Sequence, residues 1–169
     1  MAVLGNAKVA VIMGSDSDLP VLEPALRFLD AFGISYRAHV SSAHRVPERT
    51  AELAKAAEAQ GIEVIIAAAG GAAHLPGVIA ALTVLPVIGI PIKTDTLSGV
   101  DSLYSIVQMP SGVPVATVGI NAAQNAAILA AQILSIKDLG IRQKLHDYKA
   151  SLASQVEAKD AQLQAKLKK

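Results

Sequence analysis

Short apolar runs alternate with longer amphipathic segments along most of the chain. The run Lys8–Met13 (KVAVIM) is rich in β-branched residues and ends at Gly14, which is typical of a buried strand. The next segment, Leu19–Phe32, has apolar residues at helical spacing, and Gly33 follows it as a usual helix stop. Asp18 directly precedes this segment, so we predict that it is the N-cap of the helix.

The same alternation continues to residue 135. Further strands are predicted at Ile34–Val40, Glu63–Ala69, Pro86–Ile90 and Val113–Val118, and further helices at Pro47–Gln60, His74–Thr83, Val100–Met109 and Asn121–Ser135. Short apolar strands that alternate with helices indicate an α/β fold with a five-stranded parallel sheet between two helix layers. Right-handed crossovers then give a doubly wound three-layer sandwich, flavodoxin-like or Rossmann-like.

Residues 137–169 differ in character from residues 1–136. A row of apolar residues at helical spacing runs through them: Leu145, Tyr148, Leu152, Val156, Leu163 and Leu167. A helix of about 30 residues would be about 45 Å long, which exceeds the width of a small domain. Two interpretations are a long helix with a frayed basic end and an arm that packs on a neighbouring subunit, and we favour the arm. We therefore expect a domain at 1–136 and a C-terminal helix at 137–169.

Composition excludes several classes of protein. The length of 169 residues suits one domain, and a hydrophobic content of 52% argues against disorder. The absence of cysteine rules out disulfides, thiolate metal sites and thiol nucleophiles. A net charge of +1 argues against nucleic-acid binding and against a polybasic membrane protein. No apolar run is long enough to span a membrane, and residues 1–7 lack the pattern of a signal peptide, so we expect a soluble cytoplasmic protein.

Charge is distributed unevenly along the chain. Residues 1–136 carry 7 basic and 10 acidic side chains, whereas residues 137–169 carry 8 basic and 4 acidic ones. Alanine, with 31 copies, supplies much of the apolar content and permits close approach of helices. Because a monomer needs a charged surface to remain soluble, we expect the charge-poor body to be covered by other copies of the chain.

Polar residues gather directly after the predicted strands. The four segments concerned are 14–18 (GSDSD), 41–45 (SSAHR), 70–74 (GGAAH) and 93–99 (KTDTLSG). In an open parallel sheet, ligands bind at the carboxyl ends of the strands, near the point where strand order reverses. This coincidence is the strongest sign of a functional site that the fold alone gives.

The first of these segments suits an anion. Ser15, Ser17 and free backbone N–H groups at a helix N-terminus would bind phosphate, and a carboxylate such as Asp18 would accept hydrogen bonds from sugar hydroxyls. The segment therefore suggests a phosphorylated sugar or a nucleotide. A polar turn that merely caps the helix explains the same residues equally well.

The second segment adds Arg45, whose guanidinium can bind phosphate, beside His44. A histidine near a phosphate suits acid–base chemistry close to neutral pH. His74 falls in a third loop at the same end, and either ring could instead be a solvated or supporting histidine. We expect His39 to be packed or at a sheet edge, and His146 to lie at the surface or an interface.

Other kinds of site lack the residues that they need. No metal-ligand spacing, GxGxxG turn, Walker A lysine or GxSxG elbow is present. A response regulator would need an aspartate after the third strand, where Gly70 and Gly71 stand, and a lysine after the fifth.

Five segments taken together resemble a known enzyme family. GSDSD, SSAHR, GGAAHLPG, LSGVDSLYSIVQMP and NAAILAAQIL, in this order between residues 8 and 136, are similar to the class I N5-carboxyaminoimidazole ribonucleotide mutases of purine biosynthesis. The resemblance implies a flavodoxin-like catalytic domain, a homo-octamer with active sites at subunit contacts, a ribonucleotide substrate, and neither metal nor organic cofactor. Two departures from the family pattern are Ala68 in place of a glycine and a short segment at 119–124.

The resemblance also assigns roles to residues. His44 is the expected general acid–base, which protonates the carbamate nitrogen, releases CO2 and then removes the proton from ring carbon C4. The expected substrate-binding residues are Ser15, Asp18, Ser42, Arg45, Gly70, Gly71, Ala72 and His74. Two rivals remain: a carboxylase that acts on aminoimidazole ribonucleotide with free CO2, and a module that binds the ribotide without converting it.

Overall fold

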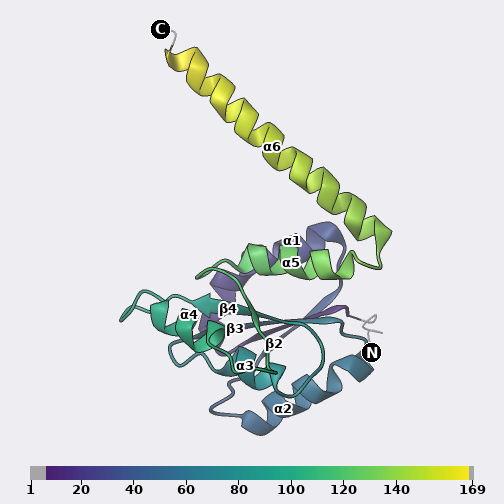
Figure 1. The fold of residues 1–169 in the computed structure, drawn as a ribbon, viewed down its shortest axis with the longest axis vertical. Helices are drawn as coiled ribbons and strands as arrows, with labels where there is room; N and C mark the ends of the chain where they lie inside the picture. Colours follow the sequence, from purple (N-terminus) through teal and green to yellow (C-terminus); the bar gives the residue numbers. More distant parts are fainter. Residues whose placement is uncertain (1–6, 168–169) are drawn as a thin grey trace.

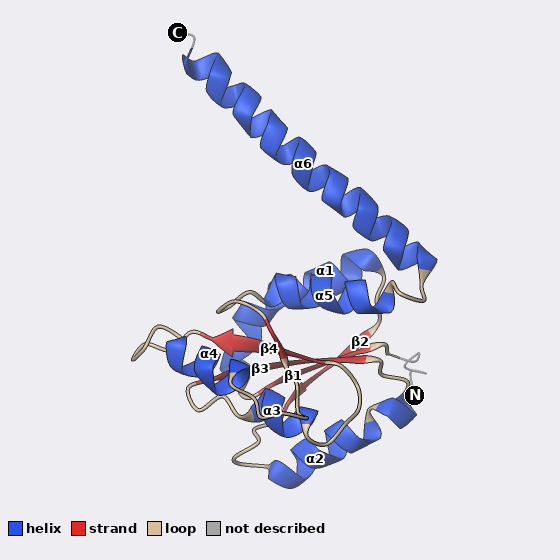
Figure 2. Cartoon of the chain, viewed as in Figure 1, coloured by secondary structure: helices blue, strands red, loops and turns tan. Residues whose placement is uncertain are grey.

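The predicted strands form one sheet in the computed structural model, which describes residues 7–167. The strands are β1 (Val9–Met13), β2 (Tyr36–Val40), β3 (Val64–Gly70), β4 (Val87–Ile92) and β5 (Ala116–Thr117). All pairs are parallel, in the order β2-β1-β3-β4-β5. This is the flavodoxin-like order, so the predicted fold class is confirmed (Figure 2). The expectation that the chain has no signal peptide concerns residues 1–7. Of these, residues 1–6 lie outside the part of the chain that the structure describes.

Helices cover both faces of the sheet, as Figure 2 shows. Helices α1 (Leu19–Phe32) and α5 (Ala123–Leu134) lie on one face; α2 (Pro47–Ala56), α3 (Leu75–Ala80) and α4 (Val100–Val107) lie on the other. Helix α6 (Leu139–Leu167) leaves this sandwich as a long arm (Figure 1). Two short 3-10 turns, η1 (Asp16–Asp18) and η2 (Glu58–Gln60), complete the elements.

Two hydrophobic cores flank the sheet because successive strand residues point to opposite faces. In β1, Val9, Val11 and Met13 pack with α1 and α5, whereas Ala10 and Ile12 pack with the helices of the other layer. Burial of both faces explains why these strands are continuously apolar rather than alternating. The alanines of α5 that face the sheet are fully buried, and small side chains there let the helix approach β3 and α1 closely.

Several element boundaries differ from the predicted ones. The predicted strand Val113–Val118 pairs with β4 only at Ala116 and Thr117, since Pro114 has no N–H to donate to a ladder. The predicted helix Pro47–Gln60 is α-helical only to Ala56 and finishes in the tighter turn η2. The helices expected at 74–83, 100–109 and 121–135 are each shorter by two or more residues.

The arm begins with a firm attachment to the sandwich. Lys144 Nζ donates to the carbonyl of Phe32, at the end of α1, at 2.7 Å. The ring of Tyr148 meets Phe28 and Phe32 edge-on, with centroids 5.5 and 6.0 Å away. Helix α6 has 29 residues, which confirms the predicted length. No helix within residues 7–167 is both long enough and apolar enough to cross a membrane.

Gly89, in β4, has no space for a side chain. A Cβ atom at this position would overlap Ile106 Cγ2 and lie 2.8 Å from Val115 Cγ1. We predict that Gly89→Ala lowers the free energy of unfolding by about 1–3 kcal/mol through overpacking, measured by urea denaturation.

The matched control is Gly119→Ala. There the new Cβ would meet only Ala122 Cβ at 3.6 Å, an ordinary contact. Both changes replace glycine by alanine and so restrict the unfolded chain equally. The difference between the two variants in unfolding free energy therefore reports the packing around Gly89. Equal stabilities for the two variants would contradict the account of Gly89.

Candidate active site

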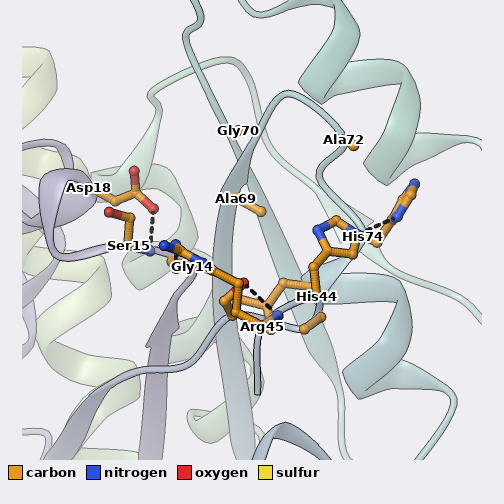
Figure 3. Close-up of a pocket in the computed structure, with 12 residues that line it drawn as sticks. Gly14, Ser15, Asp18, His44, Arg45, Ala69, Gly70, Ala72 and His74 are labelled. Carbon is orange, nitrogen blue, oxygen red and sulfur yellow. Dashed lines mark hydrogen bonds between the residues drawn. The ribbon is translucent and has the colours of Figure 1, made fainter. Parts of the chain in front are cut away.

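A pocket of about 410 Å³ opens at the carboxyl ends of the first three strands. It lies where strand order reverses between β1 and β3, the usual ligand position in this fold. The residues that line it are Gly14, Ser15, Asp18, Ser42, Ala43, His44, Arg45, Ala69, Gly70, Ala72, His74 and Leu75. The structure thus brings together three loops that are far apart in sequence (Figure 3).

Backbone hydrogen bonds beyond the strand ends hold these loops in place. The N–H of Gly14 donates to the carbonyl of Ala68 at 3.0 Å, and the N–H of Ser41 donates to the carbonyl of Met13 at 2.9 Å. Ala68, the departure from the family pattern, has its side chain fully buried in the core. The starts of the first two loops are therefore fixed to neighbouring strands.

Ser15, rather than Asp18, caps the turn that follows β1. The Ser15 hydroxyl accepts from the N–H of Ser17 at 3.3 Å and is 2.8 Å from the hydroxyl of Ser17. The Asp18 carboxylate turns back and accepts from the N–H of Ser15 at 3.2 Å. Asp18 stands at the predicted N-cap position of α1, but its side chain makes no cap hydrogen bond there. Its carboxylate is instead built into the loop that faces the pocket.

Asp18 is 8% exposed, which has an electrostatic consequence. Burial raises the pKa of its carboxyl above the ordinary 3.8, the Ser15 N–H opposes this rise, and the charge of Asp16 adds to it. A buried carboxylate that costs free energy to ionise and still faces a pocket is a candidate ligand for hydroxyl groups.

The second loop is tied to α2 by buried hydroxyl groups. Ser41 Oγ and Thr50 Oγ1 lie 2.8 Å apart, and both residues are buried. Within the loop, the N–H of Arg45 donates to Ser42 Oγ at 3.3 Å. Figure 3 shows the Arg45 guanidinium extending to Gly14 and Ser15, where it donates to the carbonyl of Gly14 at 3.5 Å. A cation and the serine-capped turn therefore share one end of the pocket.

His44 and His74 meet at the other end. His44 Nε2 and His74 Nδ1 are 2.8 Å apart, and the two rings are nearly perpendicular at 83°. A hydrogen bond between two imidazoles requires that one nitrogen donates and the other accepts, so each ring fixes the tautomer of the other. Nδ1 of His44 is the ring nitrogen that this bond leaves available for other chemistry (Figure 3).

Small residues form the wall between these two ends. Ala69, Gly70 and Ala72 line the pocket with no more than a methyl group each. Gly71 does not line it, although it was predicted with the others; its left-handed φ of 66° turns the chain here. This wall leaves room for a small apolar species and offers no side-chain polar group.

The sequence therefore indicated most of the pocket. All predicted site residues other than Gly71 and Ser17 line it, and the roles assigned to them stay predictions. The fourth polar segment, 93–99, contributes no lining residue. Ala69 and Leu75 lie outside the predicted segments, and Gly14 and Ala43 lie within them without being singled out, because apolar lining residues carry no chemical signal in a sequence. His39 lies on the edge strand β2 and His146 is exposed on α6, both outside the pocket. Within residues 7–167 there is no group of three or more side chains suited to a metal ion.

The fold and the pocket together define an α/β protein of the doubly wound class, with a pocket at the point where strand order reverses. The family model described as AIR carboxylase matches residues 8–155, and the chain belongs to this family. The chain is 61% identical to the N5-carboxyaminoimidazole ribonucleotide mutase of Pyrococcus horikoshii, over 92% of this chain and 88% of that protein. It is 59% identical to the mutase of Thermotoga maritima, over 93% and 92%.

A solved structure agrees with these relatives. The crystal structure of Treponema denticola PurE superposes with a TM-score of 0.84 at 33% identity. The match covers 92% of this chain and 97% of that one. The resemblance to the mutase family that the five sequence segments carried is thereby confirmed.

The raised pKa of Asp18 gives a prediction about pH. Because the folded pKa lies above the unfolded one, the protonated carboxyl favours folding, and this contribution is lost as the pH rises above 3.8 through the folded pKa. Asp18→Asn keeps an acceptor for the Ser15 N–H and does not ionise. We therefore expect the unfolding free energy of Asp18→Asn, relative to wild type, to increase as the pH rises from about 4 to 7, measured by urea denaturation.

Asp160→Asn, on an exposed turn of α6, controls for the loss of one negative charge. The difference in unfolding free energy between Asp160→Asn and wild type should change little over the same pH range. A difference for Asp18→Asn that falls as the pH rises would show that the site favours the charged carboxylate.

Proposed function

We propose that this chain is an N5-carboxyaminoimidazole ribonucleotide mutase, which forms 4-carboxy-5-aminoimidazole ribonucleotide in purine biosynthesis. The observation that carries the proposal is the arrangement of the pocket. Anion-binding groups stand at one end and a coupled pair of histidines at the other, with a wall of small residues between them. The names of the relatives and of the family agree with this chemistry.

The anion-binding end holds the ribose phosphate in this proposal. The guanidinium of Arg45 supplies the charge, and Ser15 and Ser42 supply hydroxyl donors. Asp18 accepts hydrogen bonds from the ribose hydroxyls, for which its position in the lining and its acceptor oxygens are suited. These contacts place the aminoimidazole ring toward His44 and the wall of Ala69, Gly70 and Ala72.

His44 carries the proton through a closed cycle. Protonated His44 gives its proton to the carbamate nitrogen, the N–C bond breaks, and CO2 leaves with the aminoimidazole ring neutral. Ring carbon C4 then attacks CO2, and neutral His44 accepts the C4 proton, which restores the starting state. His74 keeps the His44 ring oriented through the 2.8 Å hydrogen bond, so that Nδ1 of His44 faces the substrate.

Retention of CO2 is the second requirement of this reaction. Ala69, Gly70 and Ala72 present small apolar surface, which excludes water and keeps CO2 beside C4 at a high effective concentration. No step calls for a metal or an organic cofactor, because the carboxyl group itself moves between two atoms of one substrate.

We further propose that the protein is a cytoplasmic homo-octamer in which residues 137–169 form an arm on a neighbouring subunit. Ile141, Leu145 and Tyr148 of α6 pack against the core of the sandwich. The same helix face continues outward in apolar side chains that are 42–71% exposed: Leu152, Val156, Leu163 and Leu167. Exposed apolar residues also gather on α4 and the preceding loop, at Leu97, Val100, Tyr104 and Val107. The number eight rests on the family resemblance.

His44→Asn tests the proposed reaction. The amide occupies a similar space and transfers no proton at neutral pH, so we expect kcat to fall by about a thousandfold while affinity for the ribotide stays near that of wild type. Stopped-time conversion assays and calorimetric titration measure the two quantities. A rate close to wild type would remove His44 from the mechanism.

Arg45→Ala is the contrasting variant. Loss of the guanidinium should raise KM and the dissociation constant of the ribotide, with a smaller effect on kcat once substrate saturates. If both variants changed only affinity, the division of the pocket into an anion end and a proton-transfer end would be wrong.

The assembly is tested by charges on the exposed face of α6. Leu152→Glu combined with Leu163→Glu should shift the mass in sedimentation velocity from that of an octamer to smaller species, because carboxylates replace an apolar contact. The control, Ser154→Glu with Ala161→Glu, adds the same charge to the opposite helix face. The control should sediment like wild type, and a monomeric wild type would contradict the proposal.

A further inference from the structure

We propose that Ser102 is a positioning residue for the reaction: its buried hydroxyl fixes Gly71 and thereby the pocket wall and His74. This inference rests on the proposed function for its catalytic consequence, whereas its structural part stands on contacts alone. Ser102 belongs to α4, does not line the pocket, and is fully buried.

The hydroxyl of Ser102 joins the ends of two strands. It accepts from the N–H of Gly71 at 2.9 Å and donates to the carbonyl of Ile92 at 2.7 Å. Gly70 and Ile92 are register partners at the end of the β3–β4 ladder. One side chain thus binds both the first backbone donor beyond β3 and the last backbone acceptor of β4.

A second serine holds the other side of the same residue. The hydroxyl of Ser105, one turn later on α4, has a single hydrogen, which it shares between the carbonyl of Asp101 at 2.8 Å and the carbonyl of Gly71 at 3.3 Å. Helix α4 therefore binds the N–H of Gly71 through Ser102 and makes a weaker contact to its carbonyl through Ser105. Gly71 also has a φ of 66°, so a side chain there would strain the backbone.

The position of Gly71 is transmitted to the histidine pair by a very short segment. The N–H of Ala73 donates to the carbonyl of Gly71 at 2.8 Å, and the N–H of His74 donates to that of Ala72 at 2.8 Å. These two tight turns leave little freedom between Gly71 and the His74 ring. Since His74 Nδ1 is 2.8 Å from His44 Nε2, displacement of Gly71 would disturb the orientation of His44.

Ser102→Ala removes both hydrogen bonds without changing any residue that lines the pocket. We expect kcat to fall about tenfold or more, because small displacements of reacting groups are costly. KM for the ribotide should stay near that of wild type, because Arg45 and Ser15 lie in two other loops whose hydrogen bonds do not involve Ser102. Ser105→Ala should have a smaller effect in the same direction, because the N–H of Ala73 still binds the Gly71 carbonyl.

Ser135→Ala is the control for loss of a buried hydroxyl. Ser135 is 9% exposed and donates to the carbonyl of Gln132 at 2.7 Å, after the end of α5 and outside the pocket. It should lower thermal stability without a change in kcat. If folded Ser102→Ala kept the wild-type kcat, or if Ser135→Ala lost as much activity, the proposal would be overturned.

Imidazole nitrogen NMR of the substrate-free protein tests the structural part independently of activity. In Ser102→Ala, the ring signals of His44 and His74 should shift, and those of His39 and His146 should not. Ser105→Ala should give the same pattern at lower amplitude, which keeps the test available if Ser102→Ala does not fold. Unchanged signals of the histidine pair would overturn the inference, whether or not the wild type proves to be a mutase.

Discussion

A row of hydrogen bonds across the carboxyl ends of four strands determines the geometry of the site. The N–H of Ser41 binds the end of β1, and the N–H of Gly14 binds β3. The row continues from Gly71 through the hydroxyl of Ser102 to the end of β4. Each loop that carries a pocket residue therefore begins at a fixed point, and the order of the strands places those points around one crevice.

Within that frame, the chemistry of the pocket is divided by distance and by residue type. Cationic and hydroxyl groups at the Arg45 end suit a phosphate, while the coupled rings of His44 and His74 suit proton transfer. The small wall between them suits a transient CO2 molecule. In the proposed function, a phosphate anchored at one end fixes which atoms of a bound ribotide reach the other, so that binding and proton transfer use different groups of the pocket.

Sequence patterns predicted the fold well because a sheet buried on both faces requires continuous apolar strands, and glycine or proline marks their ends. They failed where the signal was local but the outcome depended on tertiary contacts. Asp18 is a residue type that often caps helices, yet its carboxylate accepts a hydrogen bond from the N–H of Ser15 instead. Strand β5 is shorter than predicted because Pro114 has no N–H to donate and because only Ala116 and Thr117 pair with β4.

The site was predictable to the extent that its residues are polar and follow strands. His44 and Arg45 stood out by both criteria, and the family resemblance assigned their roles. Their detailed relations were not accessible, because a 2.8 Å contact between His44 and His74 depends on two loops 30 residues apart. Ser102 lies in the segment LSGVDSLYSIVQMP, one of the five that carry the family resemblance, but nothing in that segment indicates that its hydroxyl bridges two strand ends.

The fate of CO2 tests the central claim most directly. Purified protein is mixed with N5-carboxyaminoimidazole ribonucleotide in buffer that contains 13C-bicarbonate, and the carboxyl carbon of the product is followed by NMR. A pocket that retains CO2 predicts full conversion with little label in the early product. Label that enters as fast as product forms, in proportion to bicarbonate, would mean that free CO2 is the substrate and that the chain acts as a carboxylase.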